Sequence, residues 1–450
     1  MQRGKLSHRP RAAVVGAVVV SLAALALSGC TGGDGGGDQV IRVVYPEQPP
    51  STAKSDVVEA VKADFEAAHE GWTLELVPVN AADADYFNRI ALMFGSADTA
   101  PDIVYDDTFQ VNAHAEAGYL APLDEHLAGW EDWDAQYSPT TQDLGKALDG
   151  TSYGIPITGG TIGLWYDKSL FESAGLPTDW QPATWDEFVA DLETLKAAHP
   201  DIVPFAAQTA EVHAEGATFQ TFEVLLQGTE GGLDGSLYDT GSGEWVTDSE
   251  GFNEALTLLS DLKANGLMAD DADLLDPNFW GTFGGWFTED KIGVALTGSW
   301  LMFLFGEYPE WTEELGWTAM PTIDGGGDGT ASMSGGWVWA MGANASDKDM
   351  TFEALTMLTS YESSLNLALG TGDVPTRIDV AETPAISENN PSIPFFYDLA
   401  NVAGIRPGLA EYPQISAAIA AATEAVTTGG MTPEEAQAAY DEAVRSITGG

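Results

Sequence analysis

The one cysteine of the chain, Cys30, stands where it can be acylated. It ends the run Leu27-Ser28-Gly29-Cys30, which resembles a lipobox, the motif at which a signal peptide is cleaved and the new N-terminal cysteine is lipidated. A basic segment and an uncharged apolar run over 12–27, short for a membrane span, precede it. The sequence therefore predicts a lipoprotein signal peptide over 1–29 and a mature chain anchored through Cys30. The alternatives are a free thiol behind an ordinary signal peptide and an uncleaved anchor helix.

Catalytic and metal-binding motifs are missing from the sequence. It contains no Gly-x-Ser-x-Gly elbow, no His-Glu-x-x-His and no Walker loop, and its 6 histidines show no metal-ligand spacing. We therefore expect no enzyme, no metal and no other cofactor. Carboxylates are abundant, however, so residue types alone leave a secreted glycoside hydrolase open as an alternative.

The charge balance restricts the class of ligand. The chain has 17 Lys and Arg against 69 Asp and Glu, a formal net charge of −52, which excludes a nucleic-acid-binding protein because phosphate contacts need clustered cations. Neutral or cationic ligands are favoured over anionic ones. A hydrophobic content of 44% with 14 Trp predicts a folded protein, and the 421 residues that remain after the expected signal peptide over 1–29 suit two domains.

The order of expected elements indicates an α/β fold. Residues 30–40 hold the lipidated cysteine and a Gly-rich tether, after which 40–45 and 73–79 read as strands on either side of a helix from about 55. Capping boxes at Thr184–Glu187 and Thr432–Glu435 predict further helices over 185–198 and from 433. Alternation of this kind predicts α/β layers with mostly parallel sheets.

A set of short segments is spread in order over nearly the whole chain after the tether. They are PDIVYDD at 101–107, AGYLAPL at 117–123, YGIP at 153–156, GLWYDKSLF at 163–171, AGL at 174–176, KIG at 291–293, GSW at 298–300, SGGW at 334–337, VPTR at 374–377 and TGGMTPEEA at 428–436. In order and spacing, this set resembles the family 1 extracellular solute-binding proteins, the sugar-capturing components of ABC importers, and in particular their maltose- and trehalose-binding members.

The resemblance implies a two-lobed fold of the periplasmic-binding-protein type (class II), with the ligand in a cleft between two α/β lobes. Lobe I would comprise 41–158 plus 338–370, and lobe II 159–337 plus 371–450. Hinges would lie near Gly159-Gly160 and Trp337-Val338.

The same resemblance implies a non-enzymatic receptor anchored by lipid to the outer face of the cytoplasmic membrane. It would capture a neutral mono- or oligosaccharide by lobe closure and deliver it to the transmembrane subunits of an ABC permease, and we expect it to act as a monomer. A receptor for a polyamine or another cationic solute is the alternative within this class, because the acidic charge would suit it.

Sugar binding needs flat aromatic faces and planar polar groups, and the resemblance places both. Trp300 and Trp337 follow small residues that leave an indole face open, and Asp107 ends a hydrophobic strand. The expected ligand-binding residues are Glu47, Asp107, Trp286, Trp300, Gly335, Gly336, Trp337 and Arg377. The competing explanations are buried packing for the tryptophans, a helix N-cap for Asp107 and an ion pair with one of many acids for Arg377.

Overall fold

A mixed sheet runs through the fold and carries the residues of interest. The computed structural model describes residues 39–47, 51–81, 83–305 and 310–449, so Cys30 and the expected signal peptide lie outside the described residues. The ten-stranded sheet has the order β2-β1-β3-β12-β4-β8-β5, with β9 and β13 paired to β4 and β14 paired to β12. The strands are β1 (Gln39–Glu47), β2 (Trp72–Asn80), β3 (Ile103–Asp107), β4 (Gly154–Asp167), β5 (Val203–Ala206), β6 (Tyr238–Asp239), β7 (Glu244–Trp245), β8 (Ile292–Gly298), β9 (Leu315–Thr318), β10 (Met320–Pro321), β11 (Thr330–Ala331), β12 (Met333–Met341), β13 (Val374–Pro375) and β14 (Gly404–Ile405).

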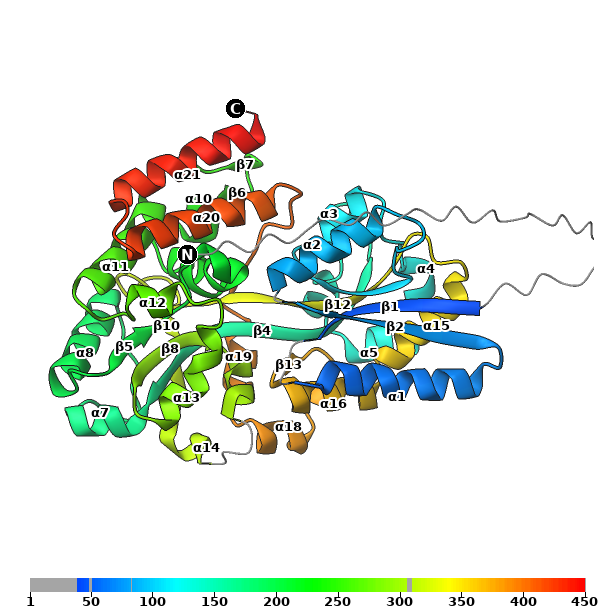
Figure 1. Cartoon of the computed structure of the whole chain (residues 1–450), viewed down its shortest axis with the longest axis horizontal. Coiled ribbons are helices and arrows are strands. Elements are labelled where there is room, and N and C mark those ends of the chain that lie inside the picture. Colours follow the sequence, from blue (N-terminus) through cyan, green and yellow to red (C-terminus); the bar gives the residue numbers. More distant parts are fainter. Residues whose placement is uncertain (1–38, 48–50, 82, 306–309, 450) are drawn as a thin grey trace, which may run out of the picture. The chain divides into compact units, whose positions relative to one another are not determined.

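Strand direction corrects the expectation of mostly parallel pairing. The pairs at the two ends of the sheet are parallel, namely β1 with β2, β1 with β3, and β5 with β8. In the middle, β12 is antiparallel to β3 and β4, and β4 is antiparallel to β8. The two long strands β4 and β12 run side by side, in opposite directions, between the left and right parts of the molecule in Figure 1.

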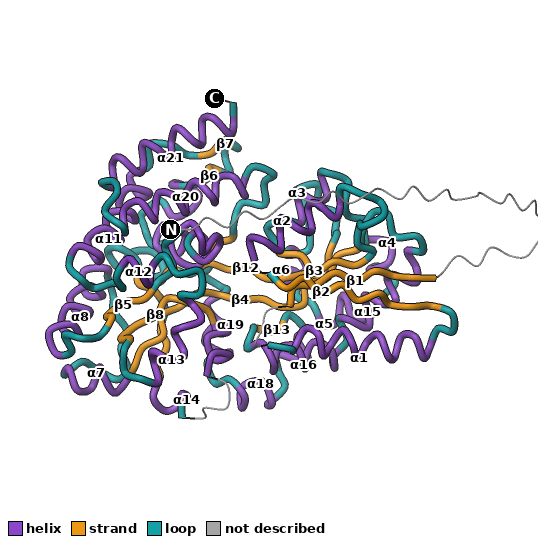
Figure 2. Tube along the Cα trace, in the orientation of Figure 1, coloured by secondary structure: helices purple, strands orange, loops and turns teal. Residues whose placement is uncertain are grey.

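Helices line both sides of the strands (Figure 2). The α-helices are α1 (Ala53–Ala68), α2 (Asp83–Phe94), α3 (Val111–Glu116), α4 (Asp124–Leu127), α5 (Glu131–Gln136), α6 (Pro139–Asp143), α7 (Lys168–Ala174), α8 (Trp185–Ala198), α9 (Glu223–Gln227), α10 (Gly232–Ser236), α11 (Glu250–Ala264), α12 (Asp271–Leu274), α13 (Phe283–Thr288), α14 (Trp311–Glu314), α15 (Lys348–Leu358), α16 (Tyr361–Thr371), α17 (Ile378–Ala381), α18 (Pro384–Asn389), α19 (Ile393–Leu399), α20 (Tyr412–Thr427) and α21 (Pro433–Thr448). The short 3-10 and π turns are η1 (Glu211–Gly216), η2 (Thr218–Phe222), η3 (Trp280–Thr282) and η4 (Ser299–Phe305). Over the described ranges, no helix is both long and apolar enough to cross a bilayer.

Buried apolar side chains gather into separate cores at the two ends of the sheet. Two neighbouring clusters draw on residues 41–157 and 338–367, and we call them the first core. A larger cluster, the second core, draws on 162–333 and 368–444. The chain passes from one core to the other within β4, within β12 and again within α16, where Leu367 and Ala368 belong to different cores. The two crossing strands therefore connect two separately packed bodies.

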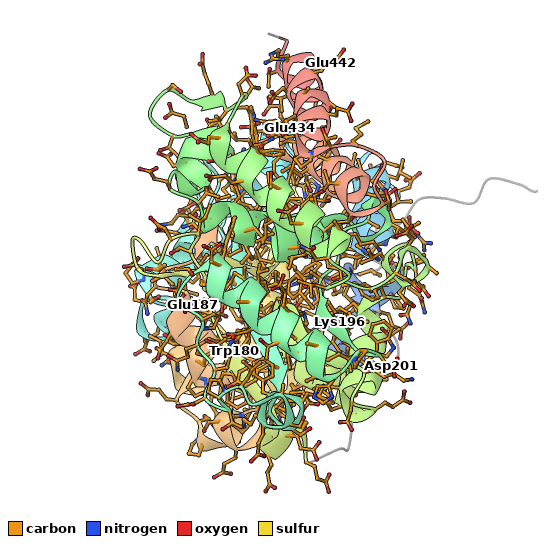
Figure 3. The ribbon with its side chains drawn as sticks, turned by 90° about the vertical axis from the view of Figure 1, so that its left-hand side faces the viewer. Trp180, Glu187, Lys196, Asp201, Glu434 and Glu442 are labelled. Carbon is orange, nitrogen blue, oxygen red and sulfur yellow. The ribbon has the colours of Figure 1, made fainter. Side chains whose placement is uncertain are left out.

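The elements expected from periodicity and capping are present. β1, α1 and β2 follow in the expected order, with Val57, Val61 and Phe65 buried on one face of α1. Thr184 caps α8 by accepting a hydrogen bond from the backbone N–H of Glu187 at 3.2 Å. The Thr432–Glu435 box caps α21 from both directions. Figure 3 shows α8 and α21 side-on, with Glu187 and Lys196 labelled towards opposite ends of α8.

Candidate ligand-binding site

The crossing strands have glycines at the centre of one face, where side chains from other elements can lie on the backbone. Gly335 of β12 lies directly opposite Gly160 of β4, and Trp337 lies opposite Asp107 of β3. Residues directly opposite each other in an antiparallel pair share a face of the sheet. Gly335 and Trp337 are two apart in one strand and therefore also share a face. These four residues, Gly160, Gly335, Trp337 and Asp107, define what we call the glycine face.

Trp300, from η4 after β8, lies against the backbone of this face. A Cβ atom at Gly160 would come within 2.6 Å of Cζ3 of the indole, and one at Gly298 within 2.2 Å of the same atom. Any larger residue at either position would displace the ring. The two glycines thus let a half-buried indole lie directly on the sheet, as the small residues around Trp300 led us to expect.

Arg406, which follows β14, covers the other part of the glycine face. A Cβ atom at Gly335 would lie 2.6 Å from Nη2 of Arg406 and 3.2 Å from the ring of Phe219. The guanidinium is held between two aromatic rings, 4.5 Å from the centroid of Phe109 and 4.2 Å from that of Phe219. Stacking of this kind stabilises a desolvated cation, and this side chain is only 3% exposed.

The guanidinium also joins acids from the two ends of the sheet. Its Nη2 donates to Oδ1 of Asp107 at 2.7 Å, and its Nη1 donates to Oε2 of Glu215 at 3.0 Å. Asp107 ends β3, which lies among the strands of the first core, whereas Glu215 belongs to η1, which packs on α20 of the second core and also contacts α2. Arg406 is therefore a charged link between the two halves of the molecule.

Burial sets the electrostatics of this link. Burial raises the pKa of Asp107 to about 7, although Arg406 and the backbone N–H of Phe109 act against the rise. Burial also disfavours the charge of Arg406, but the carboxylates of Asp107 and Glu215 outweigh it and hold its pKa above the usual value. Arg406 thus stays cationic, and Asp107 is poised to gain or lose a proton near neutral pH.

Trp337 is less open than the sequence suggested. Its indole stacks on Tyr105 with ring centroids 5.1 Å apart and on Phe87 with centroids 5.8 Å apart. The ammonium of Lys54 lies 6.0 Å from its centroid. The side chain is half-buried, so it forms one wall of the glycine face and also packs against both clusters of the first core.

Gly336 and Glu47 lie beside the glycine face rather than on it. Gly336 alternates to the opposite side of β12, where a Cβ atom would come within 2.2 Å of the carbonyl oxygen of Thr158. It therefore permits the close approach of β4 and β12. Glu47, at the end of β1, accepts a hydrogen bond from Oγ of Ser55 in α1 at 3.2 Å and is half-buried.

Arg377 is engaged elsewhere. Its side chain is 3% exposed, and its Nη1 donates to Asp132 at 2.9 Å and to the carbonyl oxygen of Thr359 at 3.1 Å. Its Nε and Nη2 hold both carboxylate oxygens of Asp379 at 3.0 and 2.8 Å. The ion-pair explanation therefore accounts for its guanidinium, and we do not include Arg377 in the site.

The contacts of Trp286 lie in the second core. It belongs to α13 and packs edge-on against Phe279, with ring centroids 5.6 Å apart, at the margin of the second core.

Sequence reasoning missed Arg406 and its aromatic neighbours. The scarcity of cations that drew attention to Arg377 applies equally to Arg406, which follows a short strand and precedes a proline. Nothing in the local sequence indicates that the two rings of Phe109 and Phe219 meet around it, because these residues lie far apart in the chain. Within the described parts of the chain, no group of three or more His, Cys, Asp or Glu is arranged to hold a metal ion.

Known proteins resemble this chain in sequence and in fold. A lactose-binding protein of Rhizobium radiobacter is 23% identical over 300 residues, which are 65% of this chain and 64% of that protein, just under two thirds of its length. The GacH receptor of Streptomyces glaucescens GLA.O, solved unliganded and with acarbose, has a TM-score of 0.74 and 22% identity, over 90% of this chain and 98% of the other. Maltose-bound MalE3 of T. maritima has a TM-score of 0.76 and 21% identity, over 90% and 100%.

These structural neighbours share the two-lobed α/β architecture, and this confirms the expected fold class. The sequence match to a family extends over residues 48–364, which contain most of the first core and the strands that form the glycine face. The chain belongs to the family of bacterial extracellular solute-binding proteins.

Proposed function

We propose that this protein captures a neutral mono- or oligosaccharide on the glycine face and delivers it to the transmembrane subunits of an ABC permease. The observation that carries the proposal is the combination of Trp300 and the Arg406–Asp107 pair around Gly160 and Gly335. An indole can cover the apolar C–H face of a sugar ring. The hydrogen bonds to Asp107 use Oδ1, so its Oδ2 is the acceptor left for a sugar hydroxyl.

The same site argues against a cationic solute. An ammonium ligand would need several carboxylates without a competing cation, whereas the carboxylates here already hold Arg406. Members of this family are binding proteins and not enzymes, which removes the glycoside hydrolase alternative. The relatives named above bind lactose, acarbose and maltose, and this supports a sugar as the ligand.

Closure of two lobes over the ligand is part of the proposal. Lobe I would comprise 41–158 plus 338–370, and lobe II 159–337 plus 371–450, with hinges near Gly159-Gly160 and Trp337-Val338. The separation of the two cores supports this division. The register of β12 against β4 shifts between Trp337 and Val338, an irregularity that suits a bend at the second hinge.

Calorimetry with maltose, lactose and trehalose, and with the polyamine spermidine, tests the ligand class. We expect at least one neutral sugar to bind with an affinity that changes little between low and high salt, because stacking and hydroxyl pairing carry the contact. An ammonium ligand held by carboxylates would weaken strongly as salt screens the charges. Tight, salt-sensitive spermidine binding without any sugar binding would overturn the proposal.

We further propose that lipid on Cys30 holds the receptor, as a monomer, at the outer face of the cytoplasmic membrane. The lipobox and the absence of any other cysteine from the sequence support this. Fractionation of cells that express Cys30→Ala should find the protein released from the membrane. A Cys30→Ala protein that stays in the membrane fraction with residues 1–29 still attached would instead indicate an uncleaved anchor helix.

A further inference from the structure

Behind Arg406 lies a buried chain of polar groups with more acids than bases. Glu215, on η1, accepts hydrogen bonds from Nη1 of Arg406 at 3.0 Å and from Oγ of Ser416 on α20. The hydroxyl of Tyr412, at the start of α20, is 3.3 Å from Oε2 of Glu215. The same hydroxyl is 2.8 Å from Oε1 of Glu223, the first residue of α9. The glycine face is thus connected to a carboxyl group deep in the second lobe.

The geometry at Tyr412 requires a proton on one of the two glutamates. A phenolic hydroxyl has one hydrogen, so it can donate to one carboxylate oxygen only. Its contact with the other glutamate is attractive only if that carboxyl is protonated and donates to the phenolic oxygen. Glu215 already accepts from a cation, whereas Glu223 is 0% exposed and its Oε2 has no hydrogen-bond partner. The proton therefore belongs on Glu223, whose hydrogen bond to Tyr412 orients that hydroxyl towards Glu215.

The charges around Glu223 favour the same arrangement. Facing it are Glu215 of η1, Tyr412 of α20, Tyr440 of α21 and, beyond Glu215, Arg406. Burial and the charge of Glu215 raise the pKa of Glu223 to about 8, while Tyr412 and Arg406 act in the opposite direction. Burial and the neighbouring carboxylates also hold the pKa of Tyr412 well above its usual value, so its hydroxyl keeps its hydrogen.

We propose that Glu223 is a positioning residue that, in its neutral form, fixes Arg406 on the glycine face through Tyr412 and Glu215. The proposal rests on the proposed sugar-binding function and adds that ligand affinity depends on a single buried proton. When Glu223 loses this proton, two carboxylates compete for one phenolic hydrogen in a space closed to water. Glu215 can then no longer hold both Tyr412 and Arg406 in the same geometry, and the guanidinium shifts against Gly335.

Sugar affinity measured between pH 6.5 and 9.5 tests this role, with the sugar found by calorimetry. The wild-type protein should bind about tenfold more weakly at pH 9 than at pH 7, because one linked proton is lost above a pKa of about 8. Glu223→Gln should keep its affinity between pH 8 and pH 9.5, since an amide donates to Tyr412 as the neutral acid does and does not titrate. A change of affinity near pH 7 that wild type and Glu223→Gln share belongs to Asp107, whose pKa burial raises to about 7. Tyr412→Phe should bind more weakly at every pH and lose most of the pH dependence.

Glu254→Gln is the matched control, because it removes a carboxylate at a half-buried position of α11. This position is in the same lobe and outside the series of hydrogen bonds from Arg406 to Glu223. It should follow the wild-type pH profile. Identical profiles for wild type and Glu223→Gln would overturn the proposal, even if sugar binding itself is confirmed.

An infrared spectrum of the unliganded protein separates this proposal from the proposed function. At pH 7 the difference between wild type and Glu223→Gln should contain the C=O stretch of one protonated carboxyl group, and the band should vanish above pH 9. If no sugar binds to any variant, the proposed function fails while the band still reports the state of Glu223. A difference spectrum with no protonated-carboxyl band overturns the neutral Glu223 whatever the ligand.

Discussion

Two buried arginines lie in similar acid-rich surroundings and differ in what else surrounds them. Arg377 spends every donor group on carboxylates and a backbone carbonyl near α5 and α17. Arg406 lies between two aromatic rings and against a glycine, where a ligand on the glycine face would meet it. A sequence contains the two side chains but not these surroundings, because each partner comes from a distant segment.

Replacing each arginine by lysine separates their roles, since lysine keeps the charge but not the planar fork. Arg406→Lys should lower sugar affinity by about 1.5 kcal/mol, roughly tenfold, because one charged hydrogen bond is lost. Arg377→Lys should instead lower the free energy of unfolding by about 1.5–3 kcal/mol and leave affinity unchanged. Calorimetry measures the affinity of both variants, and chemical denaturation measures their free energy of unfolding. A loss of affinity in Arg377→Lys alone would show that Arg377 belongs to the binding site.

Trp300 and Trp286 form a second matched pair, because both are half-buried indoles at the margin of the second core. Trp300→Ala should weaken sugar binding by about 2 kcal/mol, roughly thirtyfold, as expected for a ring that packs on a ligand. Trp286→Ala should leave the dissociation constant as it is in wild type. Equal effects of the two substitutions on binding would mean that the indole on the glycine face does not contact the sugar.

The sequence analysis selected three of the four residues of the glycine face, namely Gly335, Trp337 and Asp107. Gly335 and Trp337 are close in one strand, and Asp107 ends another, so each lies in a short segment through which the family resemblance could select it. Arg377 was selected and Arg406 was not, because the scarcity of cations does not tell which guanidinium lies against the glycine face. The use of these residues in binding stays a prediction until affinities are measured.

At the scale of elements, β4 and β12 determine where the site lies. Capping boxes and helical periodicity predicted α1, α8 and α21, because these signals are local and each helix buries one face against its own lobe. The family resemblance placed the change of lobe near Gly159-Gly160, and the first half of β4 does pack in one core and its second half in the other. The antiparallel pairing of β4 with β12 was not predicted, because strand direction within a sheet depends on segments far apart in the sequence.

Gly159 and Gly160 are adjacent in β4, and they provide a test of the close approach between this strand and the indole of Trp300. Gly160→Ala would place Cβ 2.6 Å from Trp300, so the indole must move and sugar affinity should fall at least tenfold. Gly159→Ala meets no atom nearer than 3.8 Å and should change affinity and stability little. Calorimetry and thermal unfolding on the two variants compare them directly. Normal binding by Gly160→Ala would show that the position of Trp300 is unimportant.

At the scale of the whole molecule, two separately packed cores are connected through crossing strands and a buried arginine. Separate cores allow each lobe to stay rigid while the strands bend, and the Arg406–Asp107 contact joins a side chain of one lobe to a side chain of the other. A sugar that touches Trp300 on one side and Asp107 on the other would therefore bind the approached state more tightly than the open one. That difference in affinity is what drives closure.

Distances between spin labels on the two lobes measure this closure. Leu92 of α2 and Leu275 beyond α12 are 78% and 43% exposed, and with Cys30 replaced the sequence offers no competing thiol for labels at Leu92→Cys and Leu275→Cys. Sugar should narrow and shift the distance distribution between the labels. The added substitution Trp300→Ala should require about thirtyfold more sugar for the same shift, because only the ligand's contact with the ring has been removed. A distribution that sugar leaves unchanged, in a sample shown by calorimetry to bind it, would mean that capture does not involve movement of the lobes.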